Sequence, residues 1–356
     1  MQGLQSLQGN MQRQWEPRNS KNRMLTKPET RALTFCQGNR NEENMNTYIT
    51  IDGGTTNTRI SLVKDGKVAD ILKNKVGARN GIDDRQLLRI TVKEGIEKLL
   101  ERNHVKTEEI CRILASGMIT SEFGLCNVEH IMAPAGIKEL HDTMYETVLS
   151  DITEIPFTFI RGVKIKGECV EETDVMRGEE TELMGILRDP GCAYILPGSH
   201  SKMIRTDEQG RIAAFATALT GEMIAALSQQ TILKDAVDLS VEVFDRDFLL
   251  QGYRCCEQQG INKALFKVRL LKTQFGRSKE QIYSYFMGIV LHDEIEEVLR
   301  WDAKKIVIGG RKQIKEALQI LIQDTSDTEA VCIPDEEVEH ANIWGMIKTF
   351  EYGLKM

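Results

Sequence analysis

The sequence lacks several features that mark common protein classes. No apolar run approaches the roughly 18 residues that span a bilayer, and residues 1–17 contain no apolar core of a secretory signal. The eight cysteines form no C-x-x-C pair, and the six histidines are scattered without metal-site spacing. These absences argue against a membrane-spanning helix and predict a cytoplasmic protein with reduced, buried thiols and no structural zinc.

Charge and length narrow the class further. The 356 residues include 46 Lys and Arg against 53 Asp and Glu, which gives a formal net charge of −7. This balance argues against broad binding of nucleic acids or anionic membranes, and it leaves room for a local basic pocket. The length predicts two domains, and a hydrophobic content of 41% is enough to fill both cores.

Residues 1–44 differ in composition from the rest of the chain. They are rich in Gln, Asn, Arg and Lys and show little apolar periodicity. We interpret them as a disordered extension or a mis-called start. Patterning typical of a folded domain begins at Met45.

From Met45 onward, short apolar strands alternate with amphipathic helices. The first half predicts a helix that starts at Asp83 and Asp84, a second helix at 136–149, and strands at 48–52, 59–64, 67–76, 110–116 and 156–162. Asp65-Gly66 is a strong hairpin turn between the second and third strands. The order is therefore βββαβαβ.

The second half repeats this order after a predicted helix at 176–188. It predicts strands at 192–198, 201–206, 211–219, 304–310 and 329–334. Its helices are predicted from Thr220, at 312–323 and at 338–352, with a mostly helical insertion at about 236–300. Such a repeat predicts two similar α/β domains, residues 45–170 and 171–356.

Both halves carry a polar, glycine-containing turn between their first two strands. We call Asp52–Asn57 the first tip and Pro197–Lys202 the second tip. Each turn leads into another strand, whereas a P-loop or a dinucleotide fingerprint leads into a helix. Either turn alone is compatible with an ordinary hairpin, but two such turns at equivalent places can grip a polyphosphate from both sides.

The first tip offers both metal and phosphate ligands. Asp52 at the strand end can hold Mg²⁺, which prefers one or two carboxylates together with phosphates. Backbone N–H groups and polar side chains of the remaining tip residues can surround phosphate oxygens. These residues are Gly53, Gly54, Thr55, Thr56 and Asn57.

The second tip adds Ser199, His200 and Lys202, and Lys202 can place a cation near the β- and γ-phosphates. Gly309 and Gly310 end the strand at 304–310, where a flat base and ribose could approach the backbone. A tight strand-to-helix turn is the alternative interpretation of this glycine pair.

These features resemble the sugar kinase, heat-shock 70 and actin superfamily, in which two ribonuclease-H-like domains clamp ATP between two phosphate hairpins and an adenosine loop. Over residues 46–352 the chain more closely resembles the 2-dehydro-3-deoxygalactonokinase family. The segments that carry this resemblance are YITIDGGTTNTR, ASGMITSEFGL, DVMRGEETELMGIL, YILPGSHSKMI, ALTGEM, LFKVR and FMGIVLHDEI.

The resemblance implies an α/β fold with two actin-like ATPase domains and an interdomain cleft for ATP and substrate. It implies transfer of the γ-phosphoryl group of ATP, with Mg²⁺, to the primary hydroxyl of 2-dehydro-3-deoxy-D-galactonate, giving the 6-phosphate. A kinase for another ketodeoxy or aldonic acid, or a non-catalytic actin-like nucleotide-binding protein, remains an alternative. The oligomeric state is left open, a homodimer included, and neither nucleic acid nor membrane is an expected partner.

The resemblance also implies that a catalytic base lies on the segment that links the two domains. Asp174, Glu179 and Glu180 all lie there. We favour Glu179 because it directly follows Gly178, where a substrate could approach the backbone. Glu182 is compatible with a solvated helix face.

Substrate contacts are expected on both sides of this linking segment. Arg177 could clamp the substrate carboxylate or orient the base, and a structural ion pair is its alternative role. Met118 and Thr120 follow a strand of the first half, where a substrate would be met, and a simple connection is the alternative interpretation of this segment.

Removal of residues 1–44 tests the proposed start of the folded region. A chain that begins at Met45 should be soluble and retain the activity of the full-length protein, because the first predicted strand starts three residues later. Kinase assays on both chains at equal concentration check this. Insolubility, or loss of most of the activity, contradicts it.

Overall fold

The computed structural model describes residues 46–310 and 312–353, and residues 44–356 form one compact unit. The interpretation of residues 1–44 lies outside the described residues and stays a prediction. Within the described part of the chain, no helix combines the length and the apolar character needed to cross a membrane.

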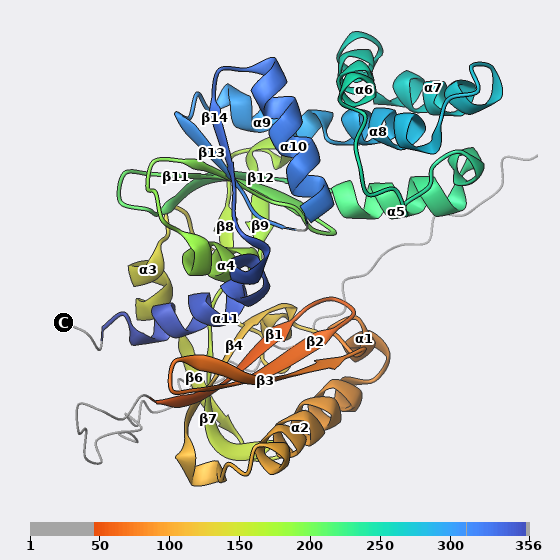
Figure 1. The fold of residues 1–356 in the computed structure, drawn as a ribbon. Helices are drawn as coiled ribbons and strands as arrows, with labels where there is room; N and C mark the ends of the chain where they lie inside the picture. The colour runs from red at the N-terminus through yellow and green to blue at the C-terminus, as the bar shows by residue number, and fades with distance from the viewer. Residues whose placement is uncertain (1–45, 311, 354–356) are drawn as a thin grey trace, which may run out of the picture. The chain divides into compact units, whose positions relative to one another are not determined.

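A six-stranded sheet is built from the first half of the chain (Figure 1). Its strand order is β3-β2-β1-β4-β7-β6, in which β1 is antiparallel to β2 and parallel to β4. The strands are β1 (Thr47–Gly53), β2 (Thr58–Lys64), β3 (Lys67–Asn74), β4 (Ile110–Gly117), β6 (Tyr145–Leu149) and β7 (Thr153–Phe159). The first tip is the turn between β1 and β2.

A five-stranded sheet of order β12-β11-β10-β13-β14 is built from the second half. Its strands are β10 (Ala193–Leu196), β11 (Ser201–Thr206), β12 (Ile212–Ala218), β13 (Lys305–Ile308) and β14 (Glu329–Cys332). Three antiparallel strands followed by two parallel ones repeat the order β3-β2-β1-β4-β7 of the first sheet. The predicted duplication and the two-domain α/β fold class are confirmed, whereas the boundary near residue 170 stays a prediction.

Helices cover the sheets and form the insertion. They are α1 (Asn80–Asp83), α2 (Arg85–Arg102), α3 (Ile137–Asp142), α4 (Glu179–Ile186), α5 (Thr220–Gln230), α6 (Arg246–Gln259), α7 (Ile261–Thr273), α8 (Lys279–Val290), α9 (His292–Arg300), α10 (Lys312–Thr325) and α11 (Asp335–Glu351). Short 3₁₀ turns occupy Thr107–Glu109, Met118–Thr120, Val170–Glu172 and Ile232–Asp235. As predicted, Asp84 caps α2, because its carboxylate accepts from the N–H groups of Gln86 and Leu87.

The helix predicted at 136–149 is wrong beyond residue 142. The chain leaves α3 there and forms β6, which pairs antiparallel with β7, so that Thr147 lies opposite Phe157. β-Branched and aromatic residues favour a strand when a partner strand is available, and this partner is not visible in the local apolar spacing. A small sheet of β5 (Ile131–Met132), β8 (Val163–Ile165) and β9 (Asp174–Met176) was also not predicted.

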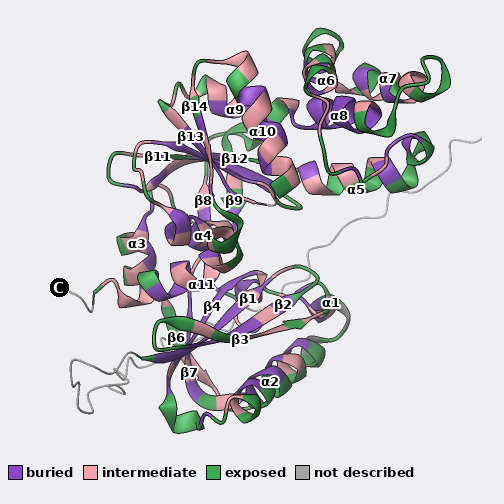
Figure 2. Cartoon of the chain, viewed as in Figure 1, coloured by how far each residue is buried: buried purple, intermediate pink, exposed green. Residues whose placement is uncertain are grey.

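Three layers of buried side chains hold these elements together. One lies between α2 and the outer face of the first sheet, and another extends from the second sheet through α9 and α10 to the insertion helices α6 to α8. The third surrounds α4 and α11 and includes Tyr48 and Leu114 of the first sheet with Tyr194 and Ile204 of the second. Figure 2 shows the resulting contrast between buried inner faces and exposed outer faces. The middle layer therefore joins the two halves.

Helices α4 and α11 touch backbone to backbone in this middle layer. A Cβ atom placed on Gly185 would lie 1.9 Å from the carbonyl oxygen of Ala341. A Cβ atom on Gly345 would lie 1.8 Å from the carbonyl oxygen of Thr181. No side chain fits at either position, so the two glycines set how closely the helices cross.

Candidate active site

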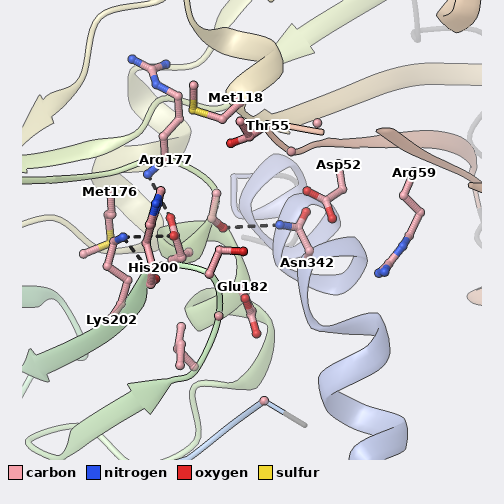
Figure 3. A pocket seen from close by; sticks show the side chains of 18 of the residues that line it. Asp52, Thr55, Arg59, Met118, Met176, Arg177, Glu182, His200, Lys202 and Asn342 are labelled. Atoms are coloured by element: carbon pink, nitrogen blue, oxygen red, sulfur yellow. Dashed lines mark hydrogen bonds and ion pairs between the residues drawn. The ribbon is translucent and has the colours of Figure 1, made fainter. Parts of the chain in front are cut away.

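A cavity of about 1340 Å³ is lined by residues from both halves of the chain. Its walls are the two tips, the segment from β9 into α4, the 3₁₀ turn after β4, and the first half of α11. Figure 3 shows Asp52 and Lys202 on opposite sides of this space. The topology places them there because the two tips occupy equivalent ends of the two sheets.

The first tip contributes only part of its predicted residues to the cavity. Asp52, Gly53, Gly54 and Thr55 line it. The Gly54 N–H donates to the carbonyl of Asn57 at 2.8 Å, so this amide closes the turn rather than pointing at a ligand. Beyond the cavity lining, the Asn57 Nδ2 donates to the Thr56 hydroxyl at 2.9 Å.

The second tip lines the cavity through Ser199, His200 and Lys202. The Lys202 side chain is almost fully buried, and its Nζ lies 3.2 Å from Oε1 of Glu179. The Nε2 of His200 lies 3.1 Å from Oε1 of Glu222, at the start of α5. The cation predicted for the phosphates is therefore already paired with the acid favoured as the base.

The two glycines that follow β13, Gly309 and Gly310, have different surroundings. The Gly309 N–H donates to the carbonyl of Ile195 at 2.8 Å, and Gly309 does not line the cavity. Gly310 does line it, with a φ of 83°. Gly310 is thus the member of this pair that a ligand could approach.

The three acids of the linking segment lie in different environments. Glu179 lines the cavity, and its Oε2 accepts from the Arg177 N–H at 3.1 Å. Glu180 is fully buried and accepts from the N–H of Gly178 at 2.7 Å. Asp174 accepts from the hydroxyl of Thr217 at 2.8 Å and lies outside the cavity lining.

A fourth acid on this helix, Glu182, also lines the cavity. Burial is the main cause that raises the pKa of Glu182 to about 8, and the nearby carboxylates of Glu179 and Asp52 contribute to this increase. The interpretation of Glu182 as part of a solvated face is therefore wrong. The spacing was the missed signal, since residues three apart on a helix share a face.

Burial also raises the pKa of Asp52, an effect that Arg59 opposes and Glu179 reinforces. Asp52, Glu179 and Glu182 thus form a group of mutually repelling carboxylates around one end of the cavity. Figure 3 shows Arg59 and Asn342 beside this group. Neither was predicted, and Asn342 comes from α11, where the local sequence carries no motif.

Asn342 connects the two halves at the cavity wall. Its Oδ1 accepts from the Ser116 hydroxyl at 3.3 Å, at the end of β4. Its Nδ2 donates to the Gly178 carbonyl at 3.4 Å, just before Glu179. The φ of 117° at Gly178 is one that side-chain-bearing residues rarely adopt, which explains a glycine directly before α4.

Arg177 lines the cavity next to Met118, and its guanidinium is turned away from Lys202 (Figure 3). Its Nη1 donates to the carbonyls of Thr120 at 2.7 Å and Val128 at 3.0 Å. Thr120 itself is fully buried and lies outside the cavity lining, so it positions Arg177.

The Nη2 of Arg177 lies 3.2 Å from Nδ1 of His130, which also lines the cavity. Burial, followed by Arg177 and Lys164, lowers the pKa of His130 to about 4. Because arginine always donates, Nδ1 of this neutral ring accepts and Nε2 carries the proton. His130 is a neutral donor that no sequence motif indicated.

Replacement of Glu182 tests the electrostatics of the carboxylate group. Its folded-state pKa of about 8 lies above the ordinary 4.5, so the folded protein binds this proton more tightly than the unfolded chain. The free energy of unfolding of the wild-type protein should therefore fall as pH rises between these two pKa values. We therefore expect the difference in melting temperature, Glu182→Gln minus wild type, to become more positive as pH rises from about 5 to about 8.5. Glu97→Gln on the exposed face of α2 is the control, and an equal response of both variants contradicts the raised pKa.

Comparisons with known proteins identify the family. The family model described as 2-keto-3-deoxy-galactonokinase matches residues 52–346. The 2-dehydro-3-deoxygalactonokinase of Escherichia coli (strain K12) is 26% identical over 253 residues, which cover 70% of this chain and 79% of that protein.

A solved structure shares the fold. The crystal structure of a candidate 2-dehydro-3-deoxygalactonokinase from Sinorhizobium meliloti superposes with a TM-score of 0.68 at 20% identity, covering 87% of this chain and 100% of that one. The match of the family model over most of the chain, with both tips and the acid-bearing helix inside it, shows that this protein belongs to the 2-keto-3-deoxy-galactonokinase family of carbohydrate kinases.

Proposed function

We propose that this protein transfers the γ-phosphoryl group of ATP to the primary hydroxyl of 2-dehydro-3-deoxy-D-galactonate. The bond from the γ-phosphorus to the β,γ-bridging oxygen breaks, a new bond to the 6-oxygen forms, and ADP leaves with the bridging oxygen. One observation carries the proposal. Both tips and an acid that could take the hydroxyl proton line a single cavity.

ATP would lie with its phosphates between the two tips and its adenosine toward Gly310. Lys202 is the cation of the second tip, and its Nζ lies 3.2 Å from Oε1 of Glu179. A γ-phosphate would compete with Glu179 for this ammonium group, which would leave the carboxylate free to meet the sugar hydroxyl. Phosphoryl transfer depends mostly on such positioning and charge neutralisation.

The residues present fit a magnesium ion. The Asp52 carboxyl lines the cavity, and burial beside Glu179 raises its pKa, a penalty that a bound cation would relieve. One carboxylate together with nucleotide phosphates is a common Mg²⁺ environment. Among the described residues no cluster of three or more His, Cys, Asp or Glu could hold a metal, so the ion would depend on the phosphates. When bound, it would neutralise charge on the transferring phosphoryl group.

Glu179 is the best candidate for the base. Asp174 and Glu180 are committed to other partners, and neither lines the cavity. Glu182 does line it, but with a pKa of about 8 it holds its proton at neutral pH and cannot accept another. Glu179 would therefore accept the proton of the 6-hydroxyl as the new bond forms.

The sugar carboxylate would be met by the pair Arg177 and His130. Arg177 supplies positive charge at the cavity wall, and His130 supplies an N–H that stays neutral through the physiological range. The loop that carries Thr120 and Val128 fixes the arginine, so the pair is set before substrate binds. A neutral sugar would forgo this interaction.

Release of ADP in a coupled assay tests the proposed substrate. With ATP and Mg²⁺, 2-dehydro-3-deoxy-D-galactonate should be phosphorylated, and the corresponding carboxamide should be a much poorer acceptor. Arg177→Met should raise the KM for the acid far more than the KM for ATP, whereas Arg59→Met, beside Asp52, should act mainly on ATP. Equal use of acid and amide contradicts the carboxylate pocket, and no turnover with any sugar acid contradicts the kinase.

Replacement of Glu179 by Gln tests the base, because the side chain keeps its shape and loses its basicity. Turnover should fall by at least about 10²-fold while ATP affinity stays within a few-fold. Asp174→Asn and Glu182→Gln are the comparison variants and should keep more than about a tenth of wild-type turnover. The assignment is wrong if Glu179→Gln stays active while one of the comparison variants, or Glu180→Gln, abolishes turnover.

A further inference from the structure

The second tip is held from two opposite faces. Successive residues of a strand point to opposite sides of the sheet. Lys202 and Ile204 of β11 face the middle layer around α4. Ser201 and Met203 face the other way, where Met203 packs into the core formed with α9. Ser201, fully buried, therefore lies behind the tip rather than in the cavity.

A buried carboxyl, Glu294 of α9, lies behind this face of β11. It is 0% exposed, and its Oε1 accepts from the hydroxyl of Thr220. Burial raises its pKa to about 7, against the hydrogen bonds from Thr220 and Ser201, which lower it. Its Oε2 has no hydrogen-bond partner among the described residues. A charged carboxylate at this depth is costly unless hydrogen bonds or an opposite charge compensate for its lost hydration.

Two chains of contacts, here called arms, lead from Glu294 to the second tip, and the first runs through Ser201. The Ser201 side chain is near enough to the Glu294 carboxyl to lower its pKa, and the Ser201 oxygen accepts from the Gly198 N–H at 3.3 Å. Gly198 lines the cavity at the turn of the hairpin. Ser201 thus connects the surroundings of Glu294 to an amide of the tip.

The other arm runs through Thr220 into the first turn of α5. The next residue, Gly221, packs so closely that an added Cβ would lie 2.4 Å from the Gly198 carbonyl oxygen. After it, the Glu222 N–H donates to the Ser199 carbonyl at 3.3 Å. Both arms therefore end on the turn residues that line the cavity.

We propose that Glu294 is a positioning residue for the nucleotide phosphates, acting through Ser201 and Thr220 to hold the second tip in its binding conformation. The inference rests on the proposed function, since it takes the second tip as a phosphate site. Glu294 does not line the cavity and touches no reacting atom.

A carboxylate suits this place better than a neutral side chain. Ser201 and Thr220 are both buried, so each hydroxyl needs an acceptor inside the protein. A carboxyl group has two oxygens, so it offers an acceptor site to each of the two hydroxyls. Glutamine would offer one oxygen and would direct an N–H₂ group at the remaining hydroxyl.

Binding of a non-hydrolysable β,γ-imido analogue of ATP, measured by calorimetry with Mg²⁺ and no acceptor, tests the role. Glu294→Gln should raise the Kd by about tenfold, because an amide keeps only one oxygen acceptor for the two hydroxyls beside the tip. In turnover assays the KM for ATP should rise similarly while the KM for the sugar acid changes by less than about twofold. A purely structural loss would change both constants or only the melting temperature.

Glu296→Gln is the matched control. This acid lies two residues further along α9, and its carboxylate accepts a hydrogen bond from the Tyr253 hydroxyl of α6 instead of contacting the tip. Its analogue Kd should equal that of wild type. If Glu294→Gln does not fold, Ser201→Ala and Thr220→Val each remove one arm, and each should weaken analogue binding. Unchanged binding in Glu294→Gln, or in both single-arm variants, overturns the role.

The wild-type result separates this proposal from the proposed function. A wild-type protein that binds the analogue but does not phosphorylate the sugar acid contradicts the substrate assignment and leaves the Glu294 comparison decisive. A wild-type protein that does not bind the analogue overturns both.

Discussion

The close crossing of α4 and α11 is the constraint on which the site depends. Gly185 and Gly345 let the two backbones touch, and the surrounding core draws side chains from both sheets. Helix α4 carries Glu179 and Glu182 into the cavity, and α11 carries Asn342. A larger residue at either glycine would push the helices apart and shift these groups relative to the tips, which belong to different sheets.

Electrostatics give the cavity its character. Asp52, Glu179 and Glu182 repel one another in a partly desolvated space, with Lys202 and Arg59 as the nearby cations. A cation bound among these carboxylates would relieve their repulsion. The raised pKa of Glu182, about 8, lets this carboxyl keep its proton at neutral pH and reduces the repulsion.

Much of the fold could be predicted because its signals are local. Apolar alternation and tight polar turns placed both triple-stranded meanders, and the repeat of that pattern predicted the duplication. The prediction failed at 143–149, where β6 exists only because β7 is there to pair with it. It also failed for Glu182, whose spacing from Glu179 was visible although its burial was not.

The sequence by itself determined the two triple-stranded meanders and the two tips, since these follow from spacing and turn chemistry within a few residues, and the family resemblance supplied the set of candidate acids. Only the tertiary structure decided which acids face the cavity, because neighbouring helix residues point about 100° apart and the surrounding elements set their burial. It also brought Asn342 to Gly178, His130 to Arg177 and Glu294 to the second tip. These contacts join segments far apart in the chain, and no local pattern encodes them.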